Sequence, residues 1–430
     1  MHSAMPRAPS RRRSLIPCTA LALVAPTLVA ALASPSPAGG SGHDPVLVGR
    51  AVLDFDTYAG PPASGAFVIP GPGIRNTVEF PLPGQPVEGF SAIIDGRHHG
   101  EILAMPDNGF GNKMNSVDFL IRAYHLRPHF KTADGGSGEV EVGDHISFRD
   151  PFDRIGFTIV NDDTDARLLT GGDIDPESLQ RGRHGDLWVG DEFGPWILHF
   201  DSRGRLLDAP FPVDDLKSPS NPFLVPPAPA THPASRGFEA MAISPDRRYL
   251  YGALEGALMT DTATAPNRRF IYEFSTADEE FTGRTLQYEV ETETPFVSDM
   301  QALGRHRLLV IERDAGSGAT ALFRKAYVVD TRRTDARGFL EKTQVVDLAA
   351  IPDPDLVSLP PRNPGDVGLG DPFRVTCESV EAVHVVRGNR IMVGCDNNFP
   401  NSGRNPALPD DNEFILVDVP RLRGHGHGHG

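Results

Sequence analysis

Carboxylate side chains recur along this sequence in pairs of positions that flank short apolar hairpins. The first position of each pair lies at the start of the hairpin, and the second follows its second apolar stretch. The first positions are Ser91, Glu177, Glu239, Asp299 and Glu378, spaced by 86, 62, 60 and 79 residues. The second positions are Asp107, Asp191 with Glu192, Glu255, Glu312 and Asp396. Because a hairpin returns the chain to its start, both members of each pair should lie at the same open end.

Side-chain oxygens at these positions are ligands for a hard cation. Asp107-Asn108-Gly109-Phe110 parallels Asp396-Asn397-Asn398-Phe399, so amides accompany the carboxylates. Ca²⁺ takes about six to eight oxygen ligands, and clustered carboxylates repel one another unless a cation neutralises them. We therefore predict one or more Ca²⁺ ions. The alternative is that these acids cap strand ends and satisfy turn N–H groups. The predicted ligands are Asp107, Asn108, Asp191, Glu255, Asp299, Glu312, Glu378, Asp396 and Asn397.

Two acids and four basic residues near these positions are candidates for chemistry on an anionic ester. Glu192 and Glu239 are candidate general bases, because a carboxylate that is not saturated by metal can accept a proton from water. Basic groups next to the acids can hold a phosphate oxygen beside a metal, and each is alternatively an ordinary ion-pair partner. These candidates for substrate binding are Lys113, Arg236, Arg313 and Arg404. The sequence contains no G-x-S-x-G, P-loop or H-E-x-x-H motif, which argues against a serine hydrolase.

The repeated hairpins predict the fold. Their apolar stretches are rich in Val, Ile, Leu and Tyr, and their turns hold Gly, Asn, Asp and Pro, as strands and tight turns require. Further strands are predicted at residues 119–126, 270–274, 327–330 and 414–419. Repeated four-stranded units close best as an all-β β-propeller with an acidic channel mouth, and residues 46–55 could close the ring. Five blades are readable, and the length leaves room for a sixth or seventh. The rival fold is two packed β-sandwiches.

Composition narrows the class of partner. The 430 residues include 41 Lys and Arg against 57 Asp and Glu, for a net charge of -16. This balance argues against nucleic acid, whose binding depends on Lys and Arg at phosphates. Gly 44 and Pro 40 are more frequent than usual, which suits many turns and argues against a helical bundle. We expect a monomer that binds a small anionic ester.

The N-terminus is typical of a bacterial export signal. Arg11-Arg12-Arg13 precede an apolar run at residues 15–32, and Ala31-Leu32-Ala33 is an A-x-A cleavage pattern. We therefore predict a signal peptide at residues 1–33 and secretion by the Sec or twin-arginine route. The alternative is an uncleaved membrane anchor, although Pro17 and Pro26 interrupt the run and we expect no stable membrane insertion. Residues 34–420 should form the propeller, and the Gly/His-rich residues 421–430 a disordered tail.

The predicted mature chain keeps two cysteines, Cys377 and Cys395, which flank the last hairpin. An oxidising compartment favours pairing, but the two are not directly opposite in the simplest register, so the sequence leaves a disulfide open.

The same residues resemble a family of secreted bacterial proteins called phytase-like, or "esterase-like activity of phytase". The resembling blocks lie at residues 89–93 and 105–112, 168–179 and 190–196, 236–241, 254–256, 312–314, and 378–380 with 396–399. The resemblance implies hydrolysis of phosphate esters or other esters and leaves the substrate open. Ser91 departs from the acidic pattern, so the first blade would lack that ligand. No phosphodiesterase domain is fused to the chain, so any activity should lie in the propeller.

Three functions remain after these observations. The first is a secreted, Ca²⁺-dependent hydrolase of phosphate esters, in which Ca²⁺ polarises the phosphoryl group and lowers the pKa of a water. The second is a carboxylester or lactone hydrolase. The third is a non-catalytic propeller that binds a ligand and is stabilised by Ca²⁺.

Overall fold

The computed structural model describes residues 44–291, 296–420 and 422. The predicted export signal at residues 1–33 lies outside the described residues, as does all of the predicted tail except residue 422. Within the described ranges the regular structure consists of 22 strands and one short 3-10 helix, η1 (Gly318–Thr320). The all-β prediction is therefore confirmed.

Twenty of these strands form five units of four antiparallel strands, the blades. Blade 1 consists of β4 (Phe90–Asp95), β5 (Ile102–Pro106), β6 (Arg122–His129) and β7 (Glu139–Ser147). Blade 2 consists of β8 (Pro176–Arg181), β9 (Leu187–Asp191), β10 (Trp196–Phe200) and β11 (Phe211–Pro212). Blade 3 consists of β12 (Phe238–Ile243), β13 (Tyr249–Leu254), β14 (Arg268–Ser275) and β15 (Glu280–Glu289). Blade 4 consists of β16 (Phe296–Gly304), β17 (Arg307–Arg313), β18 (Arg324–Thr334) and β19 (Leu340–Asp347). Blade 5 consists of β20 (Ser379–Val385), β21 (Arg390–Asp396), β22 (Asn412–Asp418) and β1 (Val46–Leu53). The other two strands, β2 (Gly73–Arg75) and β3 (Val78–Phe80), form a separate hairpin.

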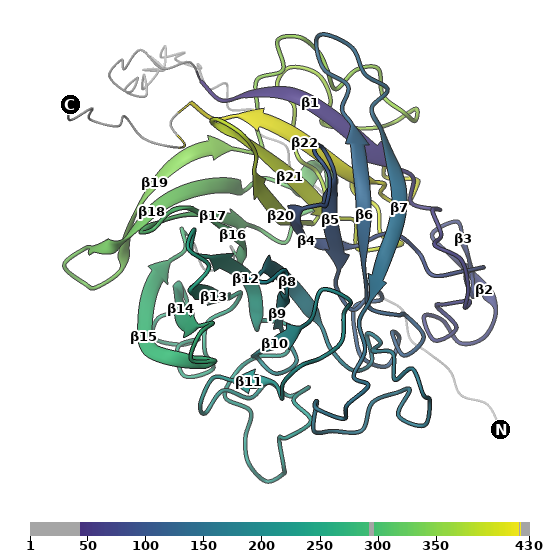
Figure 1. The fold of residues 1–430 in the computed structure, drawn as a ribbon. Helices are drawn as coiled ribbons and strands as arrows, with labels where there is room; N and C mark the ends of the chain where they lie inside the picture. Colours follow the sequence, from purple (N-terminus) through teal and green to yellow (C-terminus); the bar gives the residue numbers. More distant parts are fainter. Residues whose placement is uncertain (1–43, 292–295, 421, 423–430) are drawn as a thin grey trace, which may run out of the picture. The chain divides into compact units, whose positions relative to one another are not determined.

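The first strand of each blade lies at the centre of a closed ring. β4, β8, β12, β16 and β20 neighbour one another in that order, and β20 returns to β4; Figure 1 shows the blades around this centre. The fold is a five-bladed β-propeller, which excludes the rival pair of sandwiches. The room for a sixth or seventh blade is instead filled by the long connections at residues 148–175 and 348–378.

The N-terminal strand closes the ring, as predicted. β1 pairs with β22 in antiparallel register, from Val46 opposite Asp418 to Leu53 opposite Asn412. Val52 also lies beside Glu139 of β7 in a parallel bridge, which joins blades 5 and 1 into one eight-stranded sheet. The last blade is thus assembled from both ends of the described chain.

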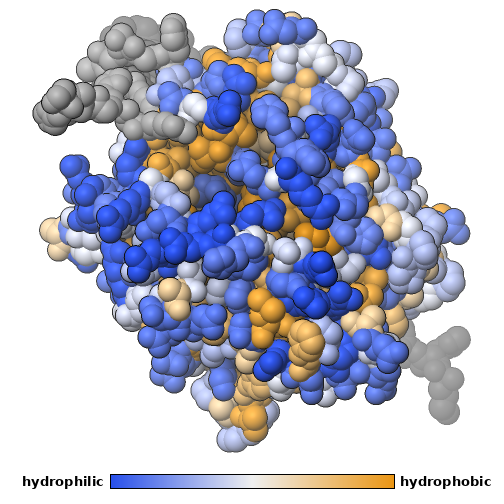
Figure 2. Space-filling view, in the orientation of Figure 1, coloured by the Kyte–Doolittle hydropathy of each residue, from blue (hydrophilic) through white to orange (hydrophobic). Residues whose placement is uncertain are grey.

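Apolar side chains from neighbouring blades pack face to face and form the core. Between blades 5 and 1, for example, Ile93 and Ala104 share a buried cluster with Ala382, Met392 and Phe414. On the face in Figure 2, hydrophilic residues predominate, and hydrophobic ones gather near its middle and at its lower tip. In the interior, every residue of β9 and of β10 is buried, so these strands are covered on both faces.

The two cysteines of the last hairpin are paired. Cys377 and Cys395 form a disulfide with a Cα–Cα distance of 6.1 Å. Cys377 directly precedes Glu378 and Cys395 directly precedes Asp396, so the bond fixes two acidic positions of blade 5 relative to each other. Closing a loop of 18 residues this way stabilises the fold by about 3 kcal/mol in the chain-entropy account.

A buried carboxylate holds the closing blade together. Glu413 in β22 accepts a hydrogen bond from Arg50 Nε of β1 at 2.5 Å and is also paired with Arg404. Burial alone would raise the pKa of Glu413, but the two guanidinium groups outweigh burial and hold that pKa below its usual value. Two further acids lie nearby, and burial raises the pKa of Asp410 to about 7 and that of Asp411 to about 6.

We predict that Glu413→Gln destabilises the protein at neutral pH by about 3 kcal/mol or more, because it leaves two buried arginines without their counter-charge. A lowered pKa in the folded state contributes stability above the unfolded pKa, and that contribution is lost as pH falls through the folded pKa. The difference in the free energy of unfolding between wild type and Glu413→Gln, measured with urea, should therefore become smaller below about pH 4.

Glu341→Gln is the matched control, since Glu341 lies exposed on β19. Equal unfolding midpoints for Glu413→Gln and Glu341→Gln at pH 7 would contradict the role given to the buried ion pairs.

Candidate functional site

Each inner strand carries a β-bulge at its start. The register with the second strand shifts across Ser91 in blade 1, Glu177 in blade 2 and Glu239 in blade 3. It shifts across Ser298 in blade 4, and blade 5 has an interruption that contains Glu381. A bulge leaves a residue unpaired and re-aims its side chain. The five bulges therefore deliver three glutamates and two serines toward the channel.

The bulged side chains meet one another. Carboxylate oxygens of Glu177, Glu239 and Glu381 all lie within 4.8 Å of one another. Ser91 Oγ donates to Glu381 Oε2 at 3.4 Å, and Ser298 Oγ accepts from Arg313 Nε at 3.1 Å. These five residues, which we call the bulge ring, come from five different blades.

A second set of side chains stands at the end of the second strand of each blade. Asp107, Glu192 and Glu255 donate their backbone N–H groups to Gly89, Asp175 and Gly237, the residues two positions before the bulged ones. Arg313 pairs with Phe296, and Asp396 with Ser379, in the corresponding places. The equivalent residues, the rim set, are Asp107, Glu192, Glu255, Arg313 and Asp396. Glu192 and Glu255 approach Glu239 closely enough to form a second group of three carboxylates within 4.8 Å.

The rim set and the three glutamates of the bulge ring line a cavity of about 170 Å³. Two arginines, Arg236 and Arg313, and the amides of Asn108 and Asn398 also line it. Its lining includes nine carboxylates: Asp107, Asp175, Glu177, Glu192, Glu239, Glu255, Glu378, Glu381 and Asp396.

Three of these carboxylates each have one oxygen without a hydrogen-bond donor, although Arg313 Nη2 lies 3.8 Å from that of Glu239. Glu177 Oε2, Glu192 Oε1 and Glu239 Oε1 are buried and accept no hydrogen bond from any described residue. The three residues are only 6 %, 3 % and 3 % exposed. Burial, and then repulsion by neighbouring carboxylates, raises the pKa of each well above the usual glutamate range. Burial and Asp191 raise the pKa of Asp175 to about 7. Clustered carboxylate oxygens are suitable ligands for a divalent cation. A bound cation would supply the partner that these three oxygens lack.

The two arginines differ in how freely they face the cavity. Arg313 Nη2 bonds Glu381 Oε1 at 2.6 Å and Glu255 Oε1 at 2.9 Å, and its side chain is 8 % exposed. Arg236 Nη1 bonds Glu255 Oε2 at 2.6 Å, with a side chain 38 % exposed. Both lie over the Phe296 ring, at 4.5 and 5.1 Å. Arg313 is therefore an internal counter-ion, whereas Arg236 can reach a bound molecule.

The turns that follow the rim set are anchored by buried phenylalanines. Phe110 and Phe399, three residues after Asp107 and Asp396, are buried and both pack on Phe80. A Cβ at Gly89 would lie 3.3 Å from Asp396 Oδ1 and 3.4 Å from Asp107 Oδ1, so glycine leaves room for both carboxylates.

Nine of the residues predicted from sequence line the cavity. They are Glu192 and Glu239 among the predicted bases, Arg236 and Arg313 among the predicted substrate contacts, and Asp107, Asn108, Glu255, Glu378 and Asp396 among the predicted ligands.

The other four predicted ligands, Asp191, Asp299, Glu312 and Asn397, do not line the cavity. Side chains of consecutive strand residues face opposite ways. Glu192 and Arg313 therefore line the cavity, whereas their neighbours Asp191 and Glu312, like Asp299 in blade 4, do not. Asp191 accepts from the N–H groups of Asp175 and Gly194, both at 2.7 Å. Asp299 accepts from Met300 and Val383, and Glu312 from Tyr288 and Lys342. Asn397 accepts from Gly89 N–H at 2.9 Å.

Two predicted substrate contacts also lie outside the cavity. Lys113 Nζ donates to Ser220 O at 3.0 Å and lies 4.6 Å from the centre of the Phe193 ring. Arg404 is paired with Glu413, as described above, and also donates to Val367 O at 2.7 Å. Both therefore support local structure.

Two acids of the cavity, Asp175 and Glu381, were not among the positions predicted from the sequence, and Glu177 was among them without a predicted role as ligand or base. The expected first position of blade 5 was Glu378, but the residue equivalent to Glu239 is Glu381. One sequence signal could have identified Glu381, namely an alanine directly after the bulged residue. It occurs in Ser91-Ala92, Glu239-Ala240 and Glu381-Ala382.

Among the described residues, no helix has the length and apolarity that crossing a membrane would require.

Comparisons with other proteins show distant relatives. A protein of Arthroderma benhamiae described as "Uncharacterized secreted protein" is 26 % identical over a stretch that covers 38 % of this chain and 40 % of the relative. The match thus spans about two fifths of that relative's length.

Solved structures with a similar fold include a GH43 β-1,3-galactosidase, with a TM-score of 0.40, 9 % identity, and coverage of 78 % of this chain and 57 % of that one. An endo-arabinase from Bacteroides thetaiotaomicron has a TM-score of 0.36, 11 % identity, and coverage of 77 % and 94 %. The Dos1 propeller has a TM-score of 0.30, 10 % identity, and coverage of 79 % and 69 %. These similarities are too low to say anything about chemistry.

The family described as "Phytase-like: Esterase-like activity of phytase" matches residues 85–399. That range includes every residue that lines the cavity. The chain therefore belongs to the phytase-like family, whose description supports a hydrolase built on a propeller.

Proposed function

We propose that this protein is an exported, cation-dependent hydrolase of phosphate esters, with its active site in the cavity at the channel mouth. The observation that carries the proposal is the set of buried carboxylate oxygens without donors, from Glu177, Glu192 and Glu239, beside Arg236. The predicted export signal and the secreted description of the relative support export.

Charge balance calls for a cation. Nine carboxylates and two arginines line the cavity, so nine minus two leaves seven charges to be protonated or neutralised. All the carboxylate and amide ligands there are oxygens, which favours Ca²⁺. Glu177, Glu239 and Glu381 would hold one ion, and Glu192, Glu239 and Glu255 offer a second place. Bound Ca²⁺ would polarise a phosphoryl oxygen and lower the pKa of a water.

Three residues of the chain would then have separate roles in the reaction. Glu239 belongs to both groups of three carboxylates, so its main role is to hold cations. Glu192 belongs to one group and keeps Oε1 free of donors, which suits a general base that takes a proton from water. Arg236 is exposed enough to bind a phosphate oxygen with its guanidinium.

A carboxylester or lactone hydrolase is the second candidate, because the family description names an esterase-like activity. The same cation and base would serve there, since a carbonyl oxygen can be polarised in the same way. Arg236 separates the two candidates, because only a phosphate ester brings an anion for it to bind.

Chelation should abolish turnover and lower the melting temperature, because a ligand that binds only the folded state stabilises it. We expect nitrophenol release from nitrophenyl phosphate or its bis-ester with Ca²⁺, and none with chelator. Release from nitrophenyl acetate alone would favour the second candidate. A Ca²⁺-shifted melting curve without turnover of any ester would leave a binding propeller.

Glu239→Gln should lower turnover at least about tenfold and reduce the Ca²⁺-induced shift in melting temperature, because the amide removes a charge shared by both groups. Glu341→Gln, on the surface, should leave both unchanged. An unaltered rate and melting shift in a folded Glu239→Gln variant would rule out the role of this carboxylate.

Arg236→Met should raise KM for nitrophenyl phosphate at least about tenfold and change KM for nitrophenyl acetate much less, because it removes the charge that meets phosphate. The measurement is a pair of saturation curves at fixed Ca²⁺. Equal changes for the two esters would show that Arg236 does not recognise the phosphate group.

A further inference from the structure

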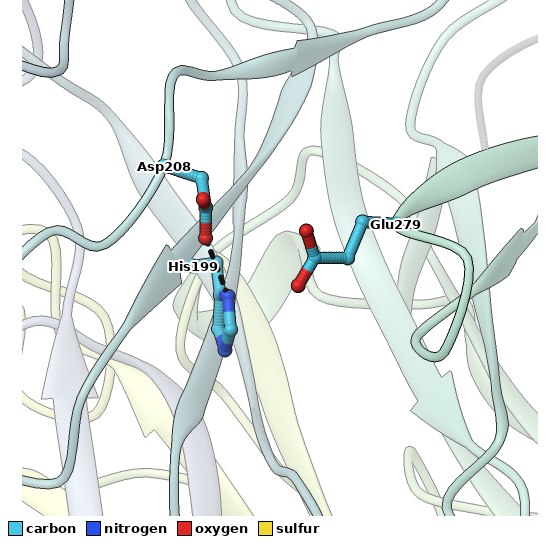
Figure 3. Close-up of side chains that lie close together, drawn as sticks. All are labelled: His199, Asp208 and Glu279. Carbon is cyan, nitrogen blue, oxygen red and sulfur yellow. Dashed lines mark hydrogen bonds and ion pairs between the residues drawn. The ribbon is translucent and has the colours of Figure 1, made fainter.

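A different group of metal-binding side chains lies where blades 2 and 3 meet. His199 belongs to β10, Asp208 to the segment after it, and Glu279 to the turn between β14 and β15. One ligand atom from each lies within 4.8 Å of the others, and none of the three lines the channel cavity. Figure 3 shows Asp208 joined to the imidazole and Glu279 extending toward it from the neighbouring blade.

The imidazole of His199 is fixed by contacts that do not involve Asp208 or Glu279. Its ring stacks on Trp188, with centroids 3.8 Å apart and planes 5° from parallel. Its Nε2 lies 3.1 Å from Asp186 Oδ2. Trp188 Nε1 donates to the same oxygen at 2.8 Å, and the backbone N–H of His184 donates to Asp186 Oδ1. The plane and the rotation of the ring are therefore set by these neighbours alone.

This arrangement leaves Nδ1 as the ligand atom. A histidine that binds metal usually donates its other ring N–H to a carboxylate, which fixes the tautomer. Asp186 is placed to accept from Nε2. Nδ1 lies 2.9 Å from Asp208 Oδ2 and, without a metal, donates its proton to that carboxylate, so a metal ion would take Nδ1 by displacing this proton. His199 is 8 % exposed, which keeps the ring in place while its Nδ1 edge meets the two acids.

The third ligand comes from the neighbouring blade. Glu279 is exposed, and its carboxylate makes no hydrogen bond or ion pair with any described residue. A tetrahedral Zn²⁺ with bonds of about 2.0–2.1 Å holds its ligands about 3.3 Å apart. Side-chain rotation of Glu279 over a short distance would bring the three ligand atoms to that spacing. The solvent side leaves a fourth position for water.

We propose that His199 Nδ1, Asp208 and Glu279 bind a divalent transition metal of the zinc class between blades 2 and 3. An imidazole with two carboxylates suits Zn²⁺, whereas the all-oxygen channel cavity suits Ca²⁺. The ion links β10 of one blade to the β14–β15 turn of the next, so it would fasten two blades whose strands share no hydrogen-bonded sheet. This site is independent of the proposed hydrolase activity.

The test measures Zn²⁺ binding to the full chain after chelation, by calorimetry and by competition with a chromophoric chelator, with Ca²⁺ in excess to occupy the channel cavity. Glu279→Gln should weaken one class of Zn²⁺ sites at least about tenfold. Its matched control is Glu280→Gln, the next residue, which is the first of β15 and is also exposed. Both variants keep the channel carboxylates and the C-terminal histidines, so the difference between them reports on this site alone.

His199→Gln should remove the same class of sites, and a crystal soaked in Zn²⁺ should show anomalous scattering between the three side chains. Equal Zn²⁺ affinity for wild type, Glu279→Gln and Glu280→Gln would overturn the proposal and leave His199 with Asp208 as an ion pair only. Loss of ester hydrolysis in any of these variants is not needed for the proposal, since the two sites share no residue.

Discussion

The closed ring of five inner strands is the constraint on which the rest of this structure depends. In a closed ring the start of each inner strand faces the same axis, and a bulge at that point turns one extra side chain inward. Because every blade repeats the device, five bulged residues from distant parts of the sequence must share one small space. The character of the site follows from which residues occupy the bulges and the neighbouring strand ends.

Blade 4 breaks the chemical symmetry of this ring. It contributes Ser298 and Arg313 where three other blades each contribute two acids. Burial opposes the charge of Arg313, but Glu381, Glu255 and Glu239 outweigh burial and raise the pKa of its guanidinium further. The guanidinium thus neutralises part of the charge of the cavity permanently, while Glu177, Glu192 and Glu239 each keep an oxygen without a hydrogen-bond donor.

The hairpins, four of the five third strands and the closing strand were predictable because alternation and turn residues are visible in single stretches of sequence, whereas β10 of blade 2 was missed. The number of blades was not predictable from the sequence, because a long connection between blades takes up as many residues as an extra blade would. The positions of the bulged residues were predicted wrongly in blades 4 and 5, by one residue where Ser298 replaces Asp299 and by three where Glu381 replaces Glu378, because a bulge interrupts the alternation of side chains. For the same reason the sequence could not decide whether Cys377 and Cys395 are paired, since that depends on the register of the last hairpin. The group around His199 combines residues from two blades, and no spacing in the sequence connects Asp208 with Glu279.

The pairing of β1 with β22 also sets an order of events during synthesis. Val46 is among the first described residues to be made and its partner, Asp418, among the last. Four blades can form behind a growing chain, but the fifth waits, and until it closes β1 presents unpaired backbone that another strand could bind. The acidic cavity cannot exist before that moment, because Asp396 and Glu381 belong to the blade that completes last. A truncated or stalled chain would therefore carry most of the fold and none of the assembled site.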